Sequence, residues 1–155
     1  MDASALIIPR IGFLPPSDPR VRSTIARVQQ DLTRDGLVYR YRTPDDLPGG
    51  EGTFTLCTFW LADALALSGE VEEAHAVFER ALSTGNDLGL FAEEFEPATG
   101  EQLGNFPQGF SHLALIGAAV DLGKAEAHPT EHESQTETDR ADRGAVSPPA
   151  ISSES

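Results

Sequence analysis

Two helix-length segments of this 155-residue chain are apolar on nearly every side. Residues 54–67 read "FTLCTFWLADALAL", where only the threonines and Asp63 are polar, and residues 110–122 read "FSHLALIGAAVDL". A helix of this kind is buried all round, whereas each helix of a small four-helix bundle shows one polar face to water. The pair therefore predicts the inner layer of a larger helical structure.

Two further segments predict amphipathic helices. Residues 17–36, "SDPRVRSTIARVQQDLTRDG", offer Ser17 or Asp18 as N-cap and Gly36 as the helix end. Residues 70–87, "EVEEAHAVFERALSTGND", carry acidic side chains on one face and apolar ones on the other. We expect an all-α fold in which outer amphipathic helices cover inner ones. The polar loops 35–53 and 85–106 would then gather at one end, where binding and chemistry usually occur.

The composition changes after Gly123. Residues 124–155 contain no aromatic side chain, and Pro, Ser, Thr and Glu dominate. Such a segment buries too little apolar surface to offset its ordering entropy, so we divide the chain into a helical unit, 1–123, and a disordered tail, 124–155. His128 and His132 have the i, i+4 spacing of metal ligands, but with no third ligand nearby we interpret them as part of a solvated tail.

Charge and composition exclude several classes of partner. The formal net charge of -14 and the pI near 4.5 argue against nucleic acid, which requires clustered Lys and Arg. No apolar run approaches the roughly 20 residues of a membrane span. The start, "MDASALIIPRIGF", lacks signal-peptide features, and Cys57 has no partner for an internal disulfide. We expect a cytoplasmic location.

Four segments carry a family resemblance. They are "DASALIIPRIGFLPPSDPRV", "DGLVYRYRT", "GGEGTFTLCTFWLADAL" and "NDLGLFAEEFEPATGEQLGNFPQGFSHLALIGAAVDL", and they run in order through residues 2–122. Together they resemble the C-terminal part of glycoside hydrolase family 15, the glucoamylases and bacterial trehalases. The resemblance implies an (α/α)6 barrel, of which this chain holds about the last third of the helices. It also implies hydrolysis of α-glucosidic bonds with inversion, on trehalose or on the α-1,4-linked ends of a maltodextrin.

The resemblance implies a general base in the acidic stretch "AEEFEPATG", residues 92–100. Inversion needs a protonated acid and an ionised base on opposite faces of the sugar, with a water beside the base. Matched residue by residue, the base falls on Glu93. The sequence departs from the family pattern at Ala92, where serine is common, and at Glu96, where aspartate is common. We expect Glu94, Glu96 and Glu101 to serve solvent and turn formation.

Four other residues are candidates for binding the sugar. Arg40, in "VYRYRT", matches a family Arg-Tyr pair in a substrate-binding loop; the alternative is an ordinary surface arginine. Glu51 lies in the glycine-flanked "GGEGTF" and could approach a ligand or cap the next helix. Phe54 and Phe110, near helix starts, could line the pocket or pack in the core. We expect Trp60 and His112 to be interior residues.

The resemblance also implies what this chain does not contain. The family's general acid and the earlier barrel helices lie upstream, so we expect the isolated chain to be inactive and its partner to be the missing N-terminal part of the barrel. The start resembles the interior of a catalytic domain, which suggests a truncated, split or vestigial product. No residue indicates a cofactor or metal. The alternative function is a tetratricopeptide-like interaction module over residues 61–87, although its period does not recur.

Overall fold

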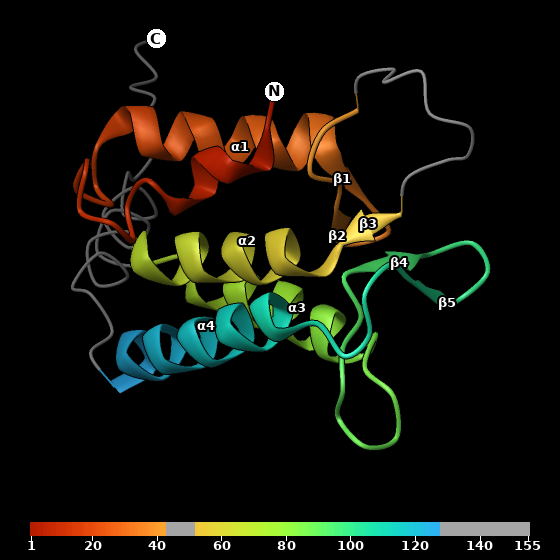
Figure 1. The fold of residues 1–155 in the computed structure, drawn as a ribbon. Helices are drawn as coiled ribbons and strands as arrows, with labels where there is room; N and C mark the ends of the chain where they lie inside the picture. Colours follow the sequence, from red (N-terminus) through yellow and green to blue (C-terminus); the bar gives the residue numbers. More distant parts are fainter. Residues whose placement is uncertain (43–51, 128–155) are drawn as a thin grey trace, which may run out of the picture.

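Four α-helices dominate the structure, a computed structural model that describes residues 1–42 and 52–127 (Figure 1). They are α1 (Pro19–Leu32), α2 (Thr55–Leu67), α3 (Val71–Leu82) and α4 (Gly109–Ala127). A short 3-10 helix, η1 (Ala3–Ile7), precedes them. Helix α2 lies between α1 with η1 on one side and α3 with α4 on the other. The mostly helical prediction is confirmed, and the strands are a small part of the fold.

Helix α2 is buried all round, as its sequence predicts. Of its 13 residues, ten are buried, including Asp63. Phe59 is fully buried and makes edge-to-face contacts with Phe78 of α3 and with Phe91, at ring-centroid distances of 5.8 and 5.6 Å. The apolar face of α1 packs on the other side of α2. Both amphipathic helices therefore pack against this inner helix, which contributes buried residues to two hydrophobic clusters.

Helix α1 begins where predicted but ends earlier. The Asp18 carboxylate accepts the Arg20 N–H at 2.8 Å, which caps the first turn. The prediction that Gly36 ends this helix is wrong: the helix ends at Leu32, and β1 (Thr33–Arg34) pairs with β2 (Leu37–Val38). Asp35 and Gly36 both have positive φ, 52° and 77°, as a two-residue hairpin turn requires.

A second sheet was not predicted. Strands β3 (Thr53–Phe54), β4 (Glu94–Glu96) and β5 (Glu101–Leu103) form an antiparallel sheet in that order. Thr53 pairs with Phe95, and Glu96 pairs with Glu101 across a turn. Both sheets lie at the end of the bundle where α2 and α4 begin (Figure 1). The described parts of the two polar loops thus meet at one end, as expected.

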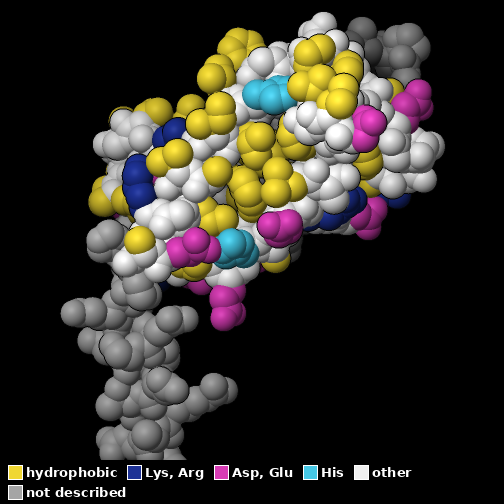
Figure 2. Space-filling model, turned by 90° about the horizontal axis from the view of Figure 1, so that it is seen from below, with side chains coloured by type: hydrophobic (Ala, Val, Ile, Leu, Met, Phe, Trp, Pro, Cys, Tyr) yellow, Lys and Arg dark blue, Asp and Glu magenta, His cyan; other side chains and the backbone are white. Residues whose placement is uncertain are grey.

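Helix α4 differs from its prediction in length and burial. It continues past Gly123 to Ala127, and only Ser111, Gly117, Ala118 and Leu122 are buried. A line of large apolar side chains along its other face is exposed: Phe110, Leu113, Ile116 and Val120. We call these four residues the α4 apolar face. Figure 2 shows hydrophobic side chains gathered across the side of the molecule on which α4 lies.

Candidate active site

Glu93 lies where three elements converge. It directly precedes β4, and its carbonyl accepts the Thr55 N–H from the start of α2 at 3.0 Å. Its own N–H donates to the Asn105 carbonyl at 2.9 Å. One residue earlier, the Ala92 carbonyl accepts the Ser111 hydroxyl of α4 at 3.0 Å. The backbone of Glu93 is thus fixed to α2, to α4 and to the loop that leads into α4.

The Glu93 carboxylate is held through one of its two oxygens. Oε2 accepts the backbone N–H of Asn105 at 3.1 Å and the side-chain Nδ2–H of Asn105 at 2.9 Å. Gly104 lies close beneath it, since a Cβ at that position would stand 2.8 Å from Oε2. The side chain is half-buried. No hydrogen bond joins Oε1 to another residue of the described ranges, so that oxygen can accept a proton.

The other glutamates of this stretch have structural partners. Glu94 Oε2 accepts the Gly52 N–H at 3.1 Å, which ties β4 to the chain entering β3. Glu96 Oε1 accepts the Ala98 N–H at 2.9 Å, within the turn between β4 and β5. Glu101 is exposed. This arrangement agrees with the expectation that they serve solvent and turn formation, except that Glu94 supports the sheet.

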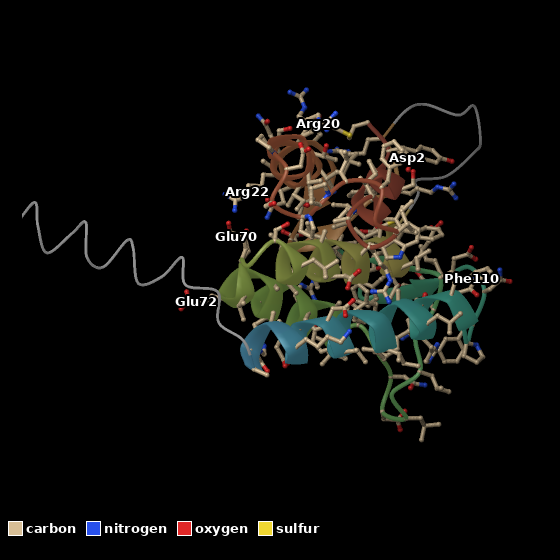
Figure 3. The ribbon with its side chains drawn as sticks, turned by 90° about the vertical axis from the view of Figure 1, so that its left-hand side faces the viewer. Asp2, Arg20, Arg22, Glu70, Glu72 and Phe110 are labelled. Atoms are coloured by element: carbon tan, nitrogen blue, oxygen red, sulfur yellow. The ribbon has the colours of Figure 1, made fainter. Side chains whose placement is uncertain are left out.

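Two of the candidate binding residues, Phe54 and Phe110, lie at the starts of the two helices that are hydrogen-bonded to residues 92 and 93. Phe54 pairs with Glu94 across β3 and β4, and it is half-buried against the core. Phe110 follows the first residue of α4 and is 67% exposed. Figure 3 places Phe110 at the N-terminal end of α4, at the edge of the molecule.

Arg40 follows β2 and is exposed. Its carbonyl accepts the Ala3 N–H at 2.8 Å, and its guanidinium lies 6.0 Å from the ring centroid of Tyr41. The Val38 N–H donates to Thr58 Oγ1 at 3.1 Å, which fixes β2 beside the first turns of α2. Arg40 therefore belongs to the same end of the bundle as Glu93, with no direct contact between the two. Glu51 lies outside the described residues, as do His128 and His132.

The two predicted interior residues behave differently. Trp60 packs against the core beside α1, as expected. His112 contacts Phe91 edge to face, and its Nδ1 pairs with the Gln108 carbonyl at 2.7 Å. Its Nε2 is buried and has no hydrogen-bond partner among the described residues, so this histidine is only half satisfied.

Sequence reasoning missed Asn105. Its role depends on the path of the loop that brings residue 105 back to residue 93, and side-chain type alone gives no sign of that path. The one available signal is Gly104, which has a positive φ of 72°. A glycine directly before a polar residue often marks a close backbone approach.

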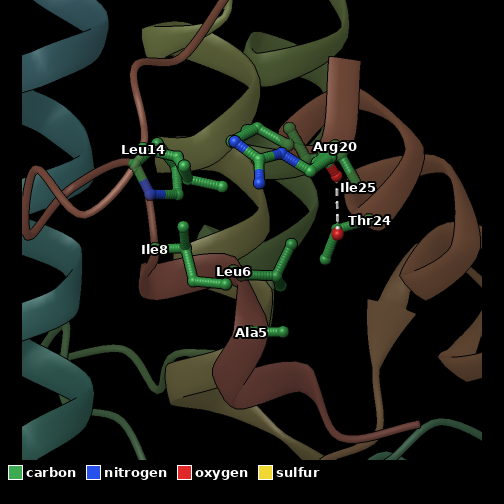
Figure 4. Close-up of a pocket in the computed structure, with 9 residues that line it drawn as sticks. Ala5, Leu6, Ile8, Leu14, Arg20, Thr24 and Ile25 are labelled. Atoms are coloured by element: carbon green, nitrogen blue, oxygen red, sulfur yellow. Dashed lines mark hydrogen bonds between the residues drawn. The ribbon is translucent and has the colours of Figure 1, made fainter. Parts of the chain in front are cut away.

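The described residues offer no alternative site of comparable chemistry. A small apolar cavity of about 140 Å³ lies between η1 and the start of α1, lined by Leu6, Ile8 and Ile25 among others (Figure 4). Its lining comes from the N-terminal segment and α1, and Glu93 is not among the residues that line it. Within residues 1–42 and 52–127, no three His, Cys, Asp or Glu side chains are grouped to hold a metal ion. In the same ranges, no helix is long and apolar enough to cross a membrane.

The family model of glycosyl hydrolases family 15 matches residues 1–120, most of the chain. This chain belongs to glycosyl hydrolase family 15. Among family 15 relatives, the trehalase of Mycobacterium tuberculosis is 54% identical over 129 residues, which are 81% of this chain and 19% of that protein. The trehalase of Thermoplasma acidophilum is 42% identical over 126 residues, 81% of this chain and 22% of that protein. The chain thus spans about a fifth of the length of these relatives.

A solved structure described as a wild-type glycosidase has the same arrangement of elements. It superposes with a TM-score of 0.67 at 25% sequence identity, and the match covers 79% of this chain and 36% of that one. The helical fold of this family 15 chain is therefore similar to part of a larger glycosidase. In both kinds of comparison, the match covers a minor share of each relative's length.

Proposed function

We propose that this chain forms the closing part of an (α/α)6 catalytic barrel that hydrolyses α-glucosidic bonds with inversion, with Glu93 as the general base. The observation that carries the proposal is the Glu93 carboxylate, half-buried at the loop end, with Oε2 held by Asn105 and Oε1 free of described partners. In an inverting reaction, Oε1 accepts a proton from a water that attacks the anomeric carbon opposite the leaving oxygen.

Trehalose is the substrate we propose, because the relatives of highest identity reported above are trehalases. The ends of an α-1,4-glucan are the alternative within the same chemistry. We assign sugar contacts to Arg40, Phe54 and Phe110, which belong to the same end of the bundle. Arg40 would donate hydrogen bonds to glucose hydroxyls, and the phenylalanines would line the pocket.

The rest of the barrel would supply the general acid and the remaining helices. The α4 apolar face supports this, since a contiguous row of exposed large side chains along one helix marks a surface that another element covers. Beside it, an open groove of about 540 Å³ runs between Pro9, Arg10 and the same face of α4. We propose that a further inner helix of the barrel packs there, on Leu113, Ile116 and Val120, and leaves Phe110 at the loop end for the sugar. On this account the catalytic domain runs from residue 1 to the end of α4, four residues past the expected boundary at Gly123, the remaining residues follow it as a tail, and the isolated chain lacks activity.

A chimera tests this function. This chain replaces the matching segment of the M. tuberculosis trehalase, whose 54% identity favours compatible packing. We expect the chimera to hydrolyse trehalose and Glu93→Gln to lower kcat by roughly 10²- to 10⁴-fold, the usual contribution of general acid–base catalysis. Glu101→Gln is the matched control, since it removes an exposed carboxylate from the same stretch, and should leave kcat unchanged. A folded chimera without activity, or equal activity in the two variants, contradicts the proposal.

A further inference from the structure

We infer that Asn105 is the positioning residue of the base, and that it determines which oxygen of Glu93 takes the proton. This inference rests on the proposed function of Glu93. Asn105 makes two hydrogen bonds to one oxygen, Oε2, from its backbone N–H and from its side-chain amide. A third bond joins the two residues in the opposite direction, from the Glu93 N–H to the Asn105 carbonyl.

The bond between the two backbones fixes the position of the Glu93 main chain, and the two bonds to Oε2 fix the rotation of its carboxylate. A glutamate side chain held only at its backbone samples several rotamers, because three of its torsions remain free. Two donors on Oε2 remove that freedom. They also occupy the favourable lone-pair directions of Oε2, whereas Oε1 has no hydrogen-bond partner among the described residues and remains able to bind a water. Oε1 is therefore the atom that accepts the proton.

Gly104 makes this arrangement possible. Its φ of 72° lies in the left-handed region that favours glycine. A Cβ at that position would stand 2.8 Å from Glu93 Oε2 and 3.0 Å from Glu93 Cβ, distances that require something to shift. Any other residue would therefore push the carboxylate away from the two Asn105 donors. Gly104 thus leaves room for the carboxylate, and Asn105 binds its Oε2.

Asn105 acts through Glu93 alone in this account. The side chain is exposed, and its one described hydrogen bond goes to the Glu93 carboxylate. Its loss should then weaken proton transfer and leave substrate binding unchanged. A hydrogen bond to a charged group contributes enough to change a rate by roughly 10- to 100-fold, so we expect a fall in kcat of that size.

The test is a double-mutant cycle in the chimera on trehalose. Asn105→Ala should lower kcat by about 10- to 100-fold with KM within about twofold, because a positioning residue affects only the transition state. Asn105→Asp, which keeps the shape but replaces the donor with a repelling carboxylate, should lower kcat at least as far. When Glu93 is already changed to Gln, Asn105→Ala should cause no further loss of residual turnover.

Three results overturn the inference. Asn105→Ala with unchanged kcat removes the positioning role. An equal loss in the chimera that keeps Glu93 and in the Glu93→Gln variant shows a structural role that does not act through the base. A rise in KM without a fall in kcat assigns Asn105 to substrate binding. Failure of the proposed function gives a different result, full activity of the Glu93→Gln chimera, so the two can be told apart.

Discussion

At the residue scale, Cys57 shows how burial sets reactivity. It lies in the first turn of α2 with 1% of its surface exposed. Burial raises the pKa of its thiol to about 12, which the nearby positive charge of Arg40 only partly offsets. Since the thiolate is the reacting form, the folded protein should resist alkylation.

We expect iodoacetamide at pH 8 to alkylate Cys57 more slowly in the folded chimera than in denaturant, by at least about 10³-fold. The factor is the ratio of thiolate fractions for a pKa of about 12 and an unfolded pKa of about 8.5. Mass spectrometry of the peptide that carries Cys57 measures both rates. Equal rates with and without denaturant would show that α2 is not buried.

At the residue scale, the sequence could point to a functional side chain only where that side chain matches a motif. Glu93 could be proposed as the base because its stretch resembles the family pattern, and the structure gives it a position consistent with that role. Asn105 could not be proposed, since its importance comes from a loop that returns to residue 93. Phe54 and Phe110 were named together but have unlike burial, which depends on the packing around each helix start.

At the element scale, a partly buried ion-pair network joins the N-terminal segment to two helices. Arg10 Nη1 lies 2.8 Å from both oxygens of Asp63 on α2 and 3.0 Å from Asp121 on α4. Burial raises the pKa of Asp63, and Arg10 opposes that effect. Burial is also the largest single effect on Asp121, but hydrogen bonds from Lys124 and Asp63 and the charges of Lys124 and Arg10 together outweigh it, so the pKa of Asp121 is lowered. Asp63, in the middle of the otherwise apolar α2, is therefore paired with Arg10, a cation from outside that helix.

Gly117 lets Arg10 reach Asp63. A Cβ at Gly117 would stand 2.6 Å from Arg10 Nη2, so Gly117→Ala should displace the guanidinium and leave the 3%-exposed Asp63 without its cation. We expect a loss of stability on the order of 1 to 3 kcal/mol, the cost of an unsatisfied buried acceptor.

Gly123→Ala on the same helix is the matched control, because nothing lies within 4 Å of its added Cβ. It should be neutral or stabilising, by up to about 1 kcal/mol, since alanine favours helix. Denaturant unfolding of the two chimera variants measures the difference. Equal stabilities would mean that the network contributes nothing to holding α4 against α2.

Helices were predicted better than strands at this scale. The positions of α2 and α3 followed from apolar patterning, and Asp18 caps α1 as one of the two expected candidates. The strands are only two or three residues long, too short for an alternating pattern to develop. The end of α4 was misplaced because Gly123, although unfavourable in a helix by about 1 kcal/mol, is tolerated within it.

At the scale of the whole molecule, the structure contains one covered inner helix and one partly covered one. Helix α2 is enclosed, whereas α4 leaves Phe110, Leu113, Ile116 and Val120 exposed. The α2 and α4 segments both predict helices buried on all sides, but only α2 is so buried, because no described element covers the apolar face of α4. The α2–α3 pair has the hairpin form that suggested an interaction module, but its residues fall within the family 15 match.

We expect the isolated chain to bind a dye for exposed apolar surface, to associate, and to unfold without a sharp transition, because the α4 apolar face has no cover. Ile116→Glu should reduce dye binding, since it breaks the middle of that face. Fluorescence titration and analytical ultracentrifugation measure these properties. A monodisperse monomer that unfolds cooperatively and binds no dye would show that the chain needs no further helices.

The central claim is that Glu93 activates the attacking water, and chemical rescue tests it most directly. In the chimera, Glu93→Ala leaves space beside the sugar, and azide, an anion that needs no deprotonation, can attack in place of water. We expect azide to restore turnover of trehalose and to yield β-glucosyl azide, since attack occurs on the face where Glu93 lies, opposite the leaving oxygen. The absence of rescue, or an α-linked azide, would contradict the assignment of Glu93 as the base.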